Sequence, residues 1–193
     1  MRSICVYCGS SEGNLREFHD AAVALGRTLA RRGLTLVYGG GCVGLMGALA
    51  DACMTAGGHV VGVIPRALLE REVGHRGVSD LRVVDSMHER KSLMAELADG
   101  FVALPGGIGT LEELFEMWTW AQLGLHRKPV GLLNVGGYFD ALLEFLDRSV
   151  DAGFIRGKHR AILQVAQHAE TLLDHFAQYE PPAIPKWIGK GET

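Results

Sequence analysis

No run of apolar residues in this sequence approaches the ~20 residues that a membrane-spanning helix requires. The first residues also lack the apolar region and the small-residue cleavage site of a signal peptide, so we expect a cytoplasmic protein. An excess of one charge is missing as well, because 19 basic and 22 acidic side chains leave a net charge of −3. A general attraction to nucleic acid or to an anionic membrane is therefore not implied, and we expect neither as a partner.

Cysteine is also rare, with four residues among 193. Cys5 and Cys8 have the CxxC spacing of a redox pair, but they fall at the end of an expected strand and not at a helix N-terminus, where a thiolate is stabilised. We therefore interpret them as small apolar residues in a reducing compartment. The eight histidines show no spacing typical of metal ligands, so the sequence predicts no structural metal.

Strand-like and helix-like segments alternate along the whole chain. We expect strands at residues 3–7, 34–38, 59–64, 81–84, 101–104, 129–134 and 162–165, and helices at residues 15–32, 44–56, 87–98, 109–123, 138–152 and 166–179. Residues 65–80 are interpreted as irregular. Alternation of this kind indicates βαβ units, and nearly continuous apolar strands indicate a sheet covered on both faces.

The predicted fold class is therefore α/β: a Rossmann-like, doubly wound and mainly parallel sheet with helices on both faces. We expect a single domain over residues 1–180, with neither an internal repeat nor a linker. Three prolines among residues 181–185 predict an extended C-terminal tail over residues 181–193. Ligands of such folds bind outside the carboxyl ends of the strands, at the point where the strand order reverses. Loops at residues 9–11, 39–47 and 105–110 follow expected strands, and we expect them to converge there.

The second of these loops matches GxGxxG through Gly39, Gly41 and Gly44, between a strand and a helix. The third expected strand offers no Asp or Glu near its end to bind a ribose hydroxyl, which weakens an NAD-binding interpretation. A P-loop is excluded because no Gly-Lys-Ser/Thr follows. The glycines could serve only the tight packing of strand, turn and helix, but we favour a contribution to a nucleotide pocket.

The third loop reads PGGIGTLEE from residue 105 and opens a helix. Its glycines let the backbone approach a ligand closely, and the helix N-terminus favours an anion such as phosphate. Thr110 and Glu113 also have the spacing of a capping box, so Glu113 could merely cap the helix. Glu112 is expected to point to solvent.

The segment Met87-His88-Glu89-Arg90-Lys91 opens another expected helix. Arg90 could bind a phosphate or a carboxylate as a fork. From the residues alone, a solvated surface arginine is the better expectation.

Together these segments resemble the Lonely Guy (LOG) family, the cytokinin riboside 5′-monophosphate phosphoribohydrolases, many of which were long labelled lysine decarboxylases. The family signature PGGxGTxxE matches residues 105–113. Further matches are Cys8-Gly9-Ser10, Tyr38-Gly39-Gly40-Gly41, the segment from Met87 to Lys91, and residues 119–124 and 128–134. The likeness extends from about residue 3 to residue 156.

The resemblance implies a homodimeric hydrolase that needs no cofactor. It would cleave the N-glycosidic bond of N6-modified or plain adenosine 5′-monophosphates to the free base, cytokinin or adenine, and ribose 5-phosphate. Arg90 and Glu113 would be the catalytic pair. Residues at substrate- or phosphate-binding positions would be Gly9, Ser10, Gly40, Gly41, Glu72, Met87, Lys91, Gly107, Ile108, Gly109, Thr110, Leu111, Glu112 and Thr119. Before Arg71-Glu72, the family's usual Met-Pro is replaced by Leu69-Glu70.

Cleavage of an N-glycoside develops positive, oxocarbenium-like charge on the ribose. An anionic Glu113 could stabilise that charge, hold a ribose hydroxyl or orient the attacking water. Arg90 does not deprotonate, so it would orient the substrate, bind phosphate or keep Glu113 ionised.

Three other classes remain open. A non-catalytic protein that binds a nucleotide or the molybdenum cofactor is the main alternative, and an NAD-dependent oxidoreductase is less favoured. A lysine decarboxylase is the weakest, since Lys91 is the one lysine near the expected pocket and nothing around it resembles a pyridoxal phosphate site. The choice between a cytokinin nucleotide and AMP as substrate stays open.

Overall fold

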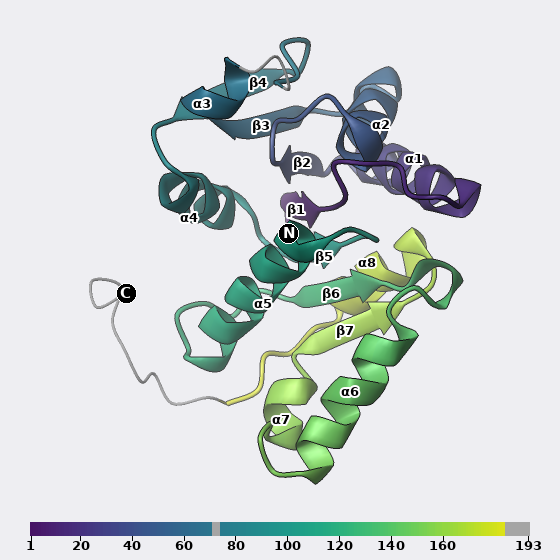
Figure 1. Ribbon diagram of the computed structural model, residues 1–193, viewed down its shortest axis with the longest axis vertical. Coiled ribbons are helices and arrows are strands. Elements are labelled where there is room, and N and C mark those ends of the chain that lie inside the picture. The colour runs from purple at the N-terminus through teal and green to yellow at the C-terminus, as the bar shows by residue number, and fades with distance from the viewer. Residues whose placement is uncertain (71–73, 184–193) are drawn as a thin grey trace.

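The computed structural model describes residues 1–70 and 74–183, which form a sheet covered by helices on both faces (Figure 1). The strands are β1 (Ser3–Tyr7), β2 (Thr35–Tyr38), β3 (Val60–Pro65), β4 (Asp80–Val84), β5 (Phe101–Ala103), β6 (Val130–Leu133) and β7 (Leu163–Ala166). The helices are α1 (Arg16–Arg31), α2 (Gly44–Thr55), α3 (Arg66–Leu69), α4 (Met87–Leu97), α5 (Ile108–Gln122), the 3-10 helix η1 (Val135–Gly137), α6 (Asp140–Asp151), α7 (Gly157–Arg160) and α8 (Ala169–Ala177).

Within the described residues the strands form one sheet in the order β4-β3-β2-β1-β5-β6-β7, and every neighbouring pair is parallel. The strand order reverses beside β1, whose residue Cys5 pairs with Val37 of β2 on one side and with Phe101 of β5 on the other. The predicted doubly wound α/β fold is confirmed. The switch point lies between the carboxyl ends of β1 and β5, where this class of sheet binds its ligands.

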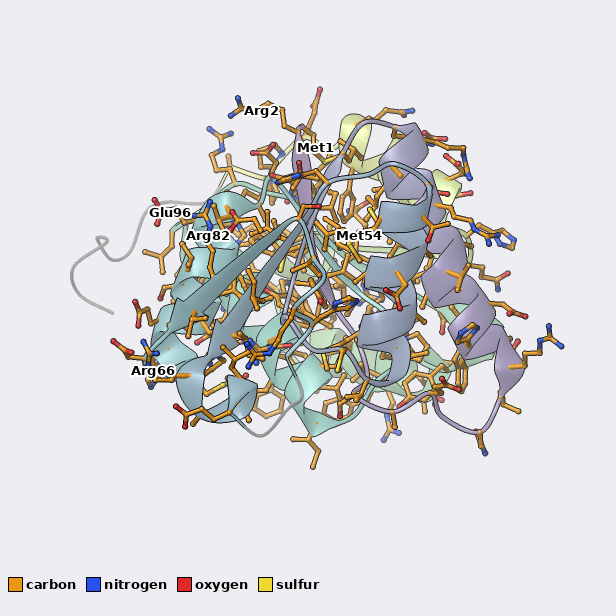
Figure 2. All side chains as sticks on the ribbon, turned by 90° about the horizontal axis from the view of Figure 1, so that it is seen from above. Met1, Arg2, Met54, Arg66, Arg82 and Glu96 are labelled. Atoms are coloured by element: carbon orange, nitrogen blue, oxygen red, sulfur yellow. The ribbon has the colours of Figure 1, made fainter. Side chains whose placement is uncertain are left out.

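The central strands are almost entirely apolar because helices cover both faces of the sheet there, whereas the edge strand β4 carries Asp80 and Arg82 and buries only Val84. All five residues of β1 and all six of β3 are buried. One core lies between the sheet and α1, α2 and α8, and the other lies between the sheet and α4 to α7. Side chains fill both layers in Figure 2, whereas charged groups such as Arg66, Arg82 and Glu96 project outward. No helix in the described part of the chain is long and apolar enough to cross a membrane.

A capping interaction sets the start of α4. The Ser86 hydroxyl accepts a hydrogen bond from the Glu89 N–H at 3.1 Å, and the Glu89 carboxylate accepts one from the Asp85 N–H at 2.8 Å. The S-x-x-E signature therefore caps a helix at residues 86–89. The alternative that Thr110 and Glu113 form a capping box does not hold, because α5 begins earlier, its N-cap is Gly107, and this cap makes no side-chain hydrogen bond.

The segment between β3 and β4 is more ordered than its charged sequence indicates. Pro65 is extended and starts the short helix α3, and an antiparallel bridge joins Gly41 to Gly74. The expectation of an irregular stretch over residues 65–80 is therefore wrong in part. Glu72 lies outside the described residues, as do residues 184–193 of the expected tail. Residues 181–183 form no regular secondary structure, and the domain boundary at residue 180 stays a prediction.

Candidate active site

A cavity of about 470 Å³ lies where the loops after β1, β2 and β5 converge with the N-terminal turns of α4 and α5. Backbone hydrogen bonds join the loops, since Gly9 donates to the Pro105 carbonyl and accepts from Leu45 N–H, each at 3.1 Å. Gly44 has a φ of +58°, and a Cβ there would lie 2.4 Å from the Ser10 carbonyl carbon. This glycine of the GxGxxG pattern therefore serves close packing, whereas Gly39 and Gly41 line the cavity.

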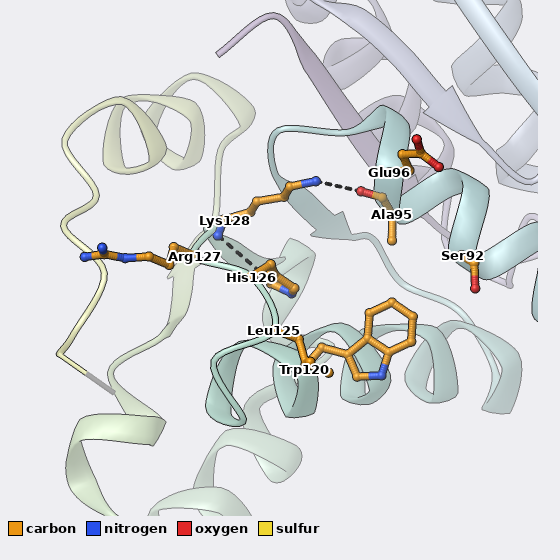
Figure 3. Close-up of a pocket in the computed structure, with 8 residues that line it drawn as sticks. All are labelled: Ser92, Ala95, Glu96, Trp120, Leu125, His126, Arg127 and Lys128. Atoms are coloured by element: carbon orange, nitrogen blue, oxygen red, sulfur yellow. Dashed lines mark hydrogen bonds between the residues drawn. The ribbon is translucent and has the colours of Figure 1, made fainter. Parts of the chain in front are cut away.

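Most of the residues expected at the site face this cavity. Those that line it are Gly9, Ser10, Gly41, Met87, Arg90, Gly107, Ile108, Gly109, Thr110, Glu112 and Glu113. The lining does not include Gly40, Lys91, Leu111 and Thr119. The Gly40 carbonyl accepts a hydrogen bond from His75 N–H at 2.8 Å, and Thr119 is exposed further along α5. Glu72 belongs to the segment that the structure does not describe. A separate pocket beside α4 and the segment after α5, lined by residues that include Trp120 and Lys128, contains none of the expected site residues (Figure 3).

Arg90 and Glu113 form an ion pair inside the cavity. The Nη2 atom of Arg90 lies 3.3 Å from Oε1 of Glu113, and each side chain is 11% exposed. The expectation of a solvated surface arginine is therefore wrong. Burial raises the pKa of Glu113, the Arg90 charge opposes that shift, and Glu112 adds to it, so the net direction is upward.

Gly39, at the end of β2, makes room for the Arg90 guanidinium. A Cβ on Gly39 would lie 2.0 Å from Nη2 and 3.1 Å from Cζ of Arg90. Met87 contacts the same group through its sulfur, 3.7 Å from Nη1. The glycine after β2 thus determines where the arginine from α4 can lie.

The N-terminus of α5 also lines the cavity, through Gly107, Ile108, Gly109 and Thr110. A Cβ added at Gly107 or Gly109 would meet no atom within 4 Å, so the backbone there faces open space. Gly106, by contrast, packs against Thr110, because a Cβ at Gly106 would lie 2.1 Å from the Thr110 hydroxyl. With no side chain capping the helix, its first N–H groups and its dipole favour an anion at this end.

Lys91 lies behind the cavity and holds α4 against α5. Its ammonium is 2.5 Å from Oε1 of Glu112 and 3.0 Å from Oε2 of Glu116, and its side chain is 10% exposed. Burial opposes the charge, but the two carboxylates outweigh it and raise the pKa of Lys91. Glu112 remains half exposed, as expected.

The cysteine thiols near the cavity are poor nucleophiles. Burial is the main cause that raises the pKa of Cys5 and of Cys8 far above the usual thiol range, and neither is in a disulfide. Among residues 1–70 and 74–183, no group of three or more His, Cys, Asp or Glu side chains is arranged to hold a metal ion.

Two sets of residues at or beside the cavity are not predicted by the sequence motifs. The apolar side chains Val43, Met46, Ile64 and Leu68 line the cavity. Val43 and Met46 belong to the loop at residues 39–47, whose glycines alone carry the pattern, and Ile64 and Leu68 come from segments with no motif. Tyr138, from the loop after β6, donates a hydrogen bond to the Gly106 carbonyl at 2.8 Å. No local signal in the sequence indicates that contact, which joins residues 32 positions apart.

The fold and the site define a Rossmann-like α/β protein with an anion-binding helix end beside a buried Arg–Glu pair. A family model described as "Possible lysine decarboxylase" matches residues 46–176. A probable cytokinin riboside 5′-monophosphate phosphoribohydrolase of Oryza sativa subsp. japonica is 54% identical over 180 residues, which cover 93% of this chain and 79% of that protein. An Arabidopsis thaliana cytokinin riboside 5′-monophosphate phosphoribohydrolase is 52% identical over 93% of this chain and 83% of its own length. The chain belongs to this family, the LOG family, as its motifs predicted.

Solved structures share the fold. The X-ray structure of TM1055, a structural-genomics target, superposes with a TM-score of 0.72 at 27% identity and covers 93% of this chain and 100% of its own. The molybdenum cofactor binding protein of Rippkaea orientalis has a TM-score of 0.69 at 21% identity, covering 92% of this chain and 97% of its own. At that identity the likeness concerns the fold alone.

Proposed function

We propose that this protein hydrolyses the N-glycosidic bond of cytokinin riboside 5′-monophosphates and releases the free base and ribose 5-phosphate. The observation that carries the proposal is the buried pair Arg90–Glu113, which shares one cavity with the uncapped N-terminus of α5. Relatives that are 52–54% identical over 93% of the chain bear the name of this activity.

In this proposal the 5′-phosphate binds at the N-terminus of α5, against Gly107, Gly109 and Thr110. That end of the helix offers N–H groups and the positive end of the dipole, and the two glycines leave open space before it. Binding of the phosphate, remote from the bond that breaks, places the ribose beside Glu113.

Glu113 then acts on the ribose as an anion. A carboxylate with 11% exposure stabilises developing oxocarbenium charge more strongly than one in water, because the local dielectric is lower. Arg90 remains charged, keeps Glu113 ionised against the effect of burial, and orients the substrate. Lys91 supports the site through Glu112 and Glu116. Contacts of Glu72, Thr119, Leu111 and Gly40 with substrate remain predictions from the family resemblance.

The apolar lining of the cavity favours an N6-modified base. Val43, Met87 and Ile108 expose 41%, 45% and 88% of their surface at its rim, where an apolar substituent would cover them. A prenylated adenosine monophosphate should therefore be a better substrate than AMP.

The description of the family as possible lysine decarboxylases does not suit Lys91. A Schiff base to pyridoxal phosphate forms from a neutral amine, whereas two carboxylates hold Lys91 charged and raise its pKa. The alternative of a molybdenum-cofactor protein is supported by the likeness of folds alone.

A homodimer and a cytoplasmic location belong to the same proposal. Dimerisation is testable by light scattering, with an expected mass near twice 20.9 kDa.

The deciding experiment is turnover of isopentenyladenosine 5′-monophosphate, with free base and ribose 5-phosphate measured by chromatography. We expect release of base from the monophosphate and little from the riboside, which lacks the phosphate. Glu113→Gln should lower kcat/KM by roughly 10²–10⁴-fold, while Glu144→Gln, on the exposed face of α6, should leave it unchanged. Failure to release base from any adenosine monophosphate would refute the proposal.

A further inference from the structure

Tyr138 contacts the glycine-rich loop after β5, at residues 105–110, from outside the cavity. Its hydroxyl donates to the Gly106 carbonyl at 2.8 Å, and its ring packs edge-on against Phe18 of α1 at 5.4 Å and Phe139 at 4.9 Å between centroids. It does not line the cavity, and 46% of its surface is exposed. The Tyr138 hydroxyl therefore neither packs in the core nor faces the cavity, and its hydrogen bond to Gly106 needs another explanation.

The peptide unit that Tyr138 holds is the one between Gly106 and Gly107. In a trans peptide the carbonyl of one residue and the N–H of the next point in opposite directions. Tyr138 holds the Gly106 carbonyl outside the cavity, so the Gly107 N–H points to the opposite side, where Gly107 lines the cavity. The orientation of one hydroxyl thus determines the direction of one amide donor.

This peptide needs such a restraint because it joins two glycines. Gly107 has no side chain to pack, and the space around its missing Cβ is open to 4 Å. Glycine also has the widest choice of backbone angles, so the two residues themselves place little restraint on the direction of this peptide.

The loop that carries Tyr138 is itself held rigidly. The Asn134 side chain accepts a hydrogen bond from Phe139 N–H at 2.8 Å and donates one to Asp140 at 2.7 Å. Gly136 and Gly137 adopt φ angles of +57° and +72°, which other residues rarely adopt. Tyr138 therefore projects from a preorganised turn between β6 and α6.

We propose that Tyr138 is a positioning residue that orients the Gly107 N–H toward the 5′-phosphate of the substrate. This inference rests on the proposed function, because it takes the N-terminus of α5 as the phosphate site. Loss of the hydroxyl frees the peptide and should weaken the binding of phosphate-bearing ligands about tenfold, the typical effect of one hydrogen bond.

The test is Tyr138→Phe, which removes the hydroxyl and keeps the ring against Phe18. Calorimetry measures the binding of ribose 5-phosphate, which has no N-glycosidic bond to hydrolyse, and of adenine, which has no phosphate. We expect ribose 5-phosphate to bind about tenfold more weakly, adenine to bind as before, and Tm to stay the same. In turnover, KM for isopentenyladenosine 5′-monophosphate should rise by a similar factor, with kcat nearly constant.

Tyr179→Phe is the matched control, since Tyr179 follows α8 and does not line the cavity. Unchanged binding of ribose 5-phosphate by Tyr138→Phe would overturn the inference, as would equal weakening of both ligands, which indicates a general loss of structure. These outcomes differ from a failure of the proposed function, in which the unaltered protein itself would bind no ribose 5-phosphate or release no base.

Discussion

Gly39→Ala tests whether the position of Arg90 controls the reaction. A methyl group at residue 39 would lie 2.0 Å from Nη2 of Arg90, where an ordinary contact is about 3.5 Å. The backbone of Gly39 does not have a left-handed φ, so alanine fits its conformation. The group that must move is the end of a flexible side chain, and the fold should therefore tolerate the change.

Gly39→Ala should therefore lower the rate of the reaction and leave the stability of the fold nearly unchanged. Nη2 must move by about 1 Å or more to relieve the contact, and this displacement breaks the 3.3 Å pairing with Glu113. Misplacement of a catalytic group by about 1 Å can lower a rate by about 10²-fold, equivalent to ~2.7 kcal/mol of activation free energy. Moving the Arg90 charge away from Glu113 also raises the pKa of Glu113 further, since Arg90 opposes the effect of burial.

The assay is kcat/KM for isopentenyladenosine 5′-monophosphate as a function of pH, together with Tm. We expect a loss of about 10²-fold, an acidic limb shifted to higher pH, and a change in Tm of no more than about 4 °C. Gly157→Ala is the control, because a Cβ at that position would meet no atom within 4 Å. If Gly39→Ala kept near-normal kcat/KM with an unshifted acidic limb, the role assigned to the Arg90–Glu113 geometry would be refuted.

Three further predictions concern pH and stability. The activity of the unaltered enzyme should fall as the pH drops through the raised pKa of Glu113, so the acidic limb of the rate profile should lie above the ordinary value of 4.5; a limb below 4.5 would contradict an essential Glu113 anion. Lys91→Met leaves Glu112 and the partly buried Glu116 without their ion-pair partner, and should lower the free energy of unfolding by about 2 kcal/mol in urea titrations. Because the pKa of Lys91 is raised in the folded protein, the ion pairs of Lys91 stabilise the fold fully at neutral pH, and this stabilisation is lost only as the pH rises through the raised pKa. If Lys91→Met were as stable as the unaltered protein at pH 7, this role of Lys91 would be contradicted. Trp118→Phe removes the indole hydrogen bond to the His159 carbonyl and should cost about 1–3 kcal/mol, measured by thermal unfolding, with activity retained.

The motifs predicted the position of the site, but not all of its contacts. Glycine-rich loops after three strands indicated a ligand site because parallel strands present their carboxyl ends on one side of the sheet. Gly44, however, serves packing, and Gly39 makes room for the guanidinium of Arg90. Both are glycines of one GxGxxG pattern, and spacing alone cannot distinguish them, since each role depends on what lies beside the missing Cβ.

Local sequence also does not indicate that Arg90 pairs with Glu113. Judged from its own helix, Arg90 is a surface arginine, and Glu113 has the spacing of a capping residue. The family resemblance paired them, and the structure brings them to 3.3 Å because α4 and α5 meet at the carboxyl edge of the sheet. Burial, which sets the direction of the Glu113 pKa shift, comes from that packing.

The order of strands and helices, the glycine turns and the family are contained in the sequence, because hydrophobic periodicity and turn chemistry act over windows of a few residues. The strand order around β1, the Gly39 contact with Arg90, and the hydrogen bond from Tyr138 to Gly106 depend on the tertiary structure. These features join segments that are 32 or more residues apart, and their distances are set only when the strands pair and the helices pack on them.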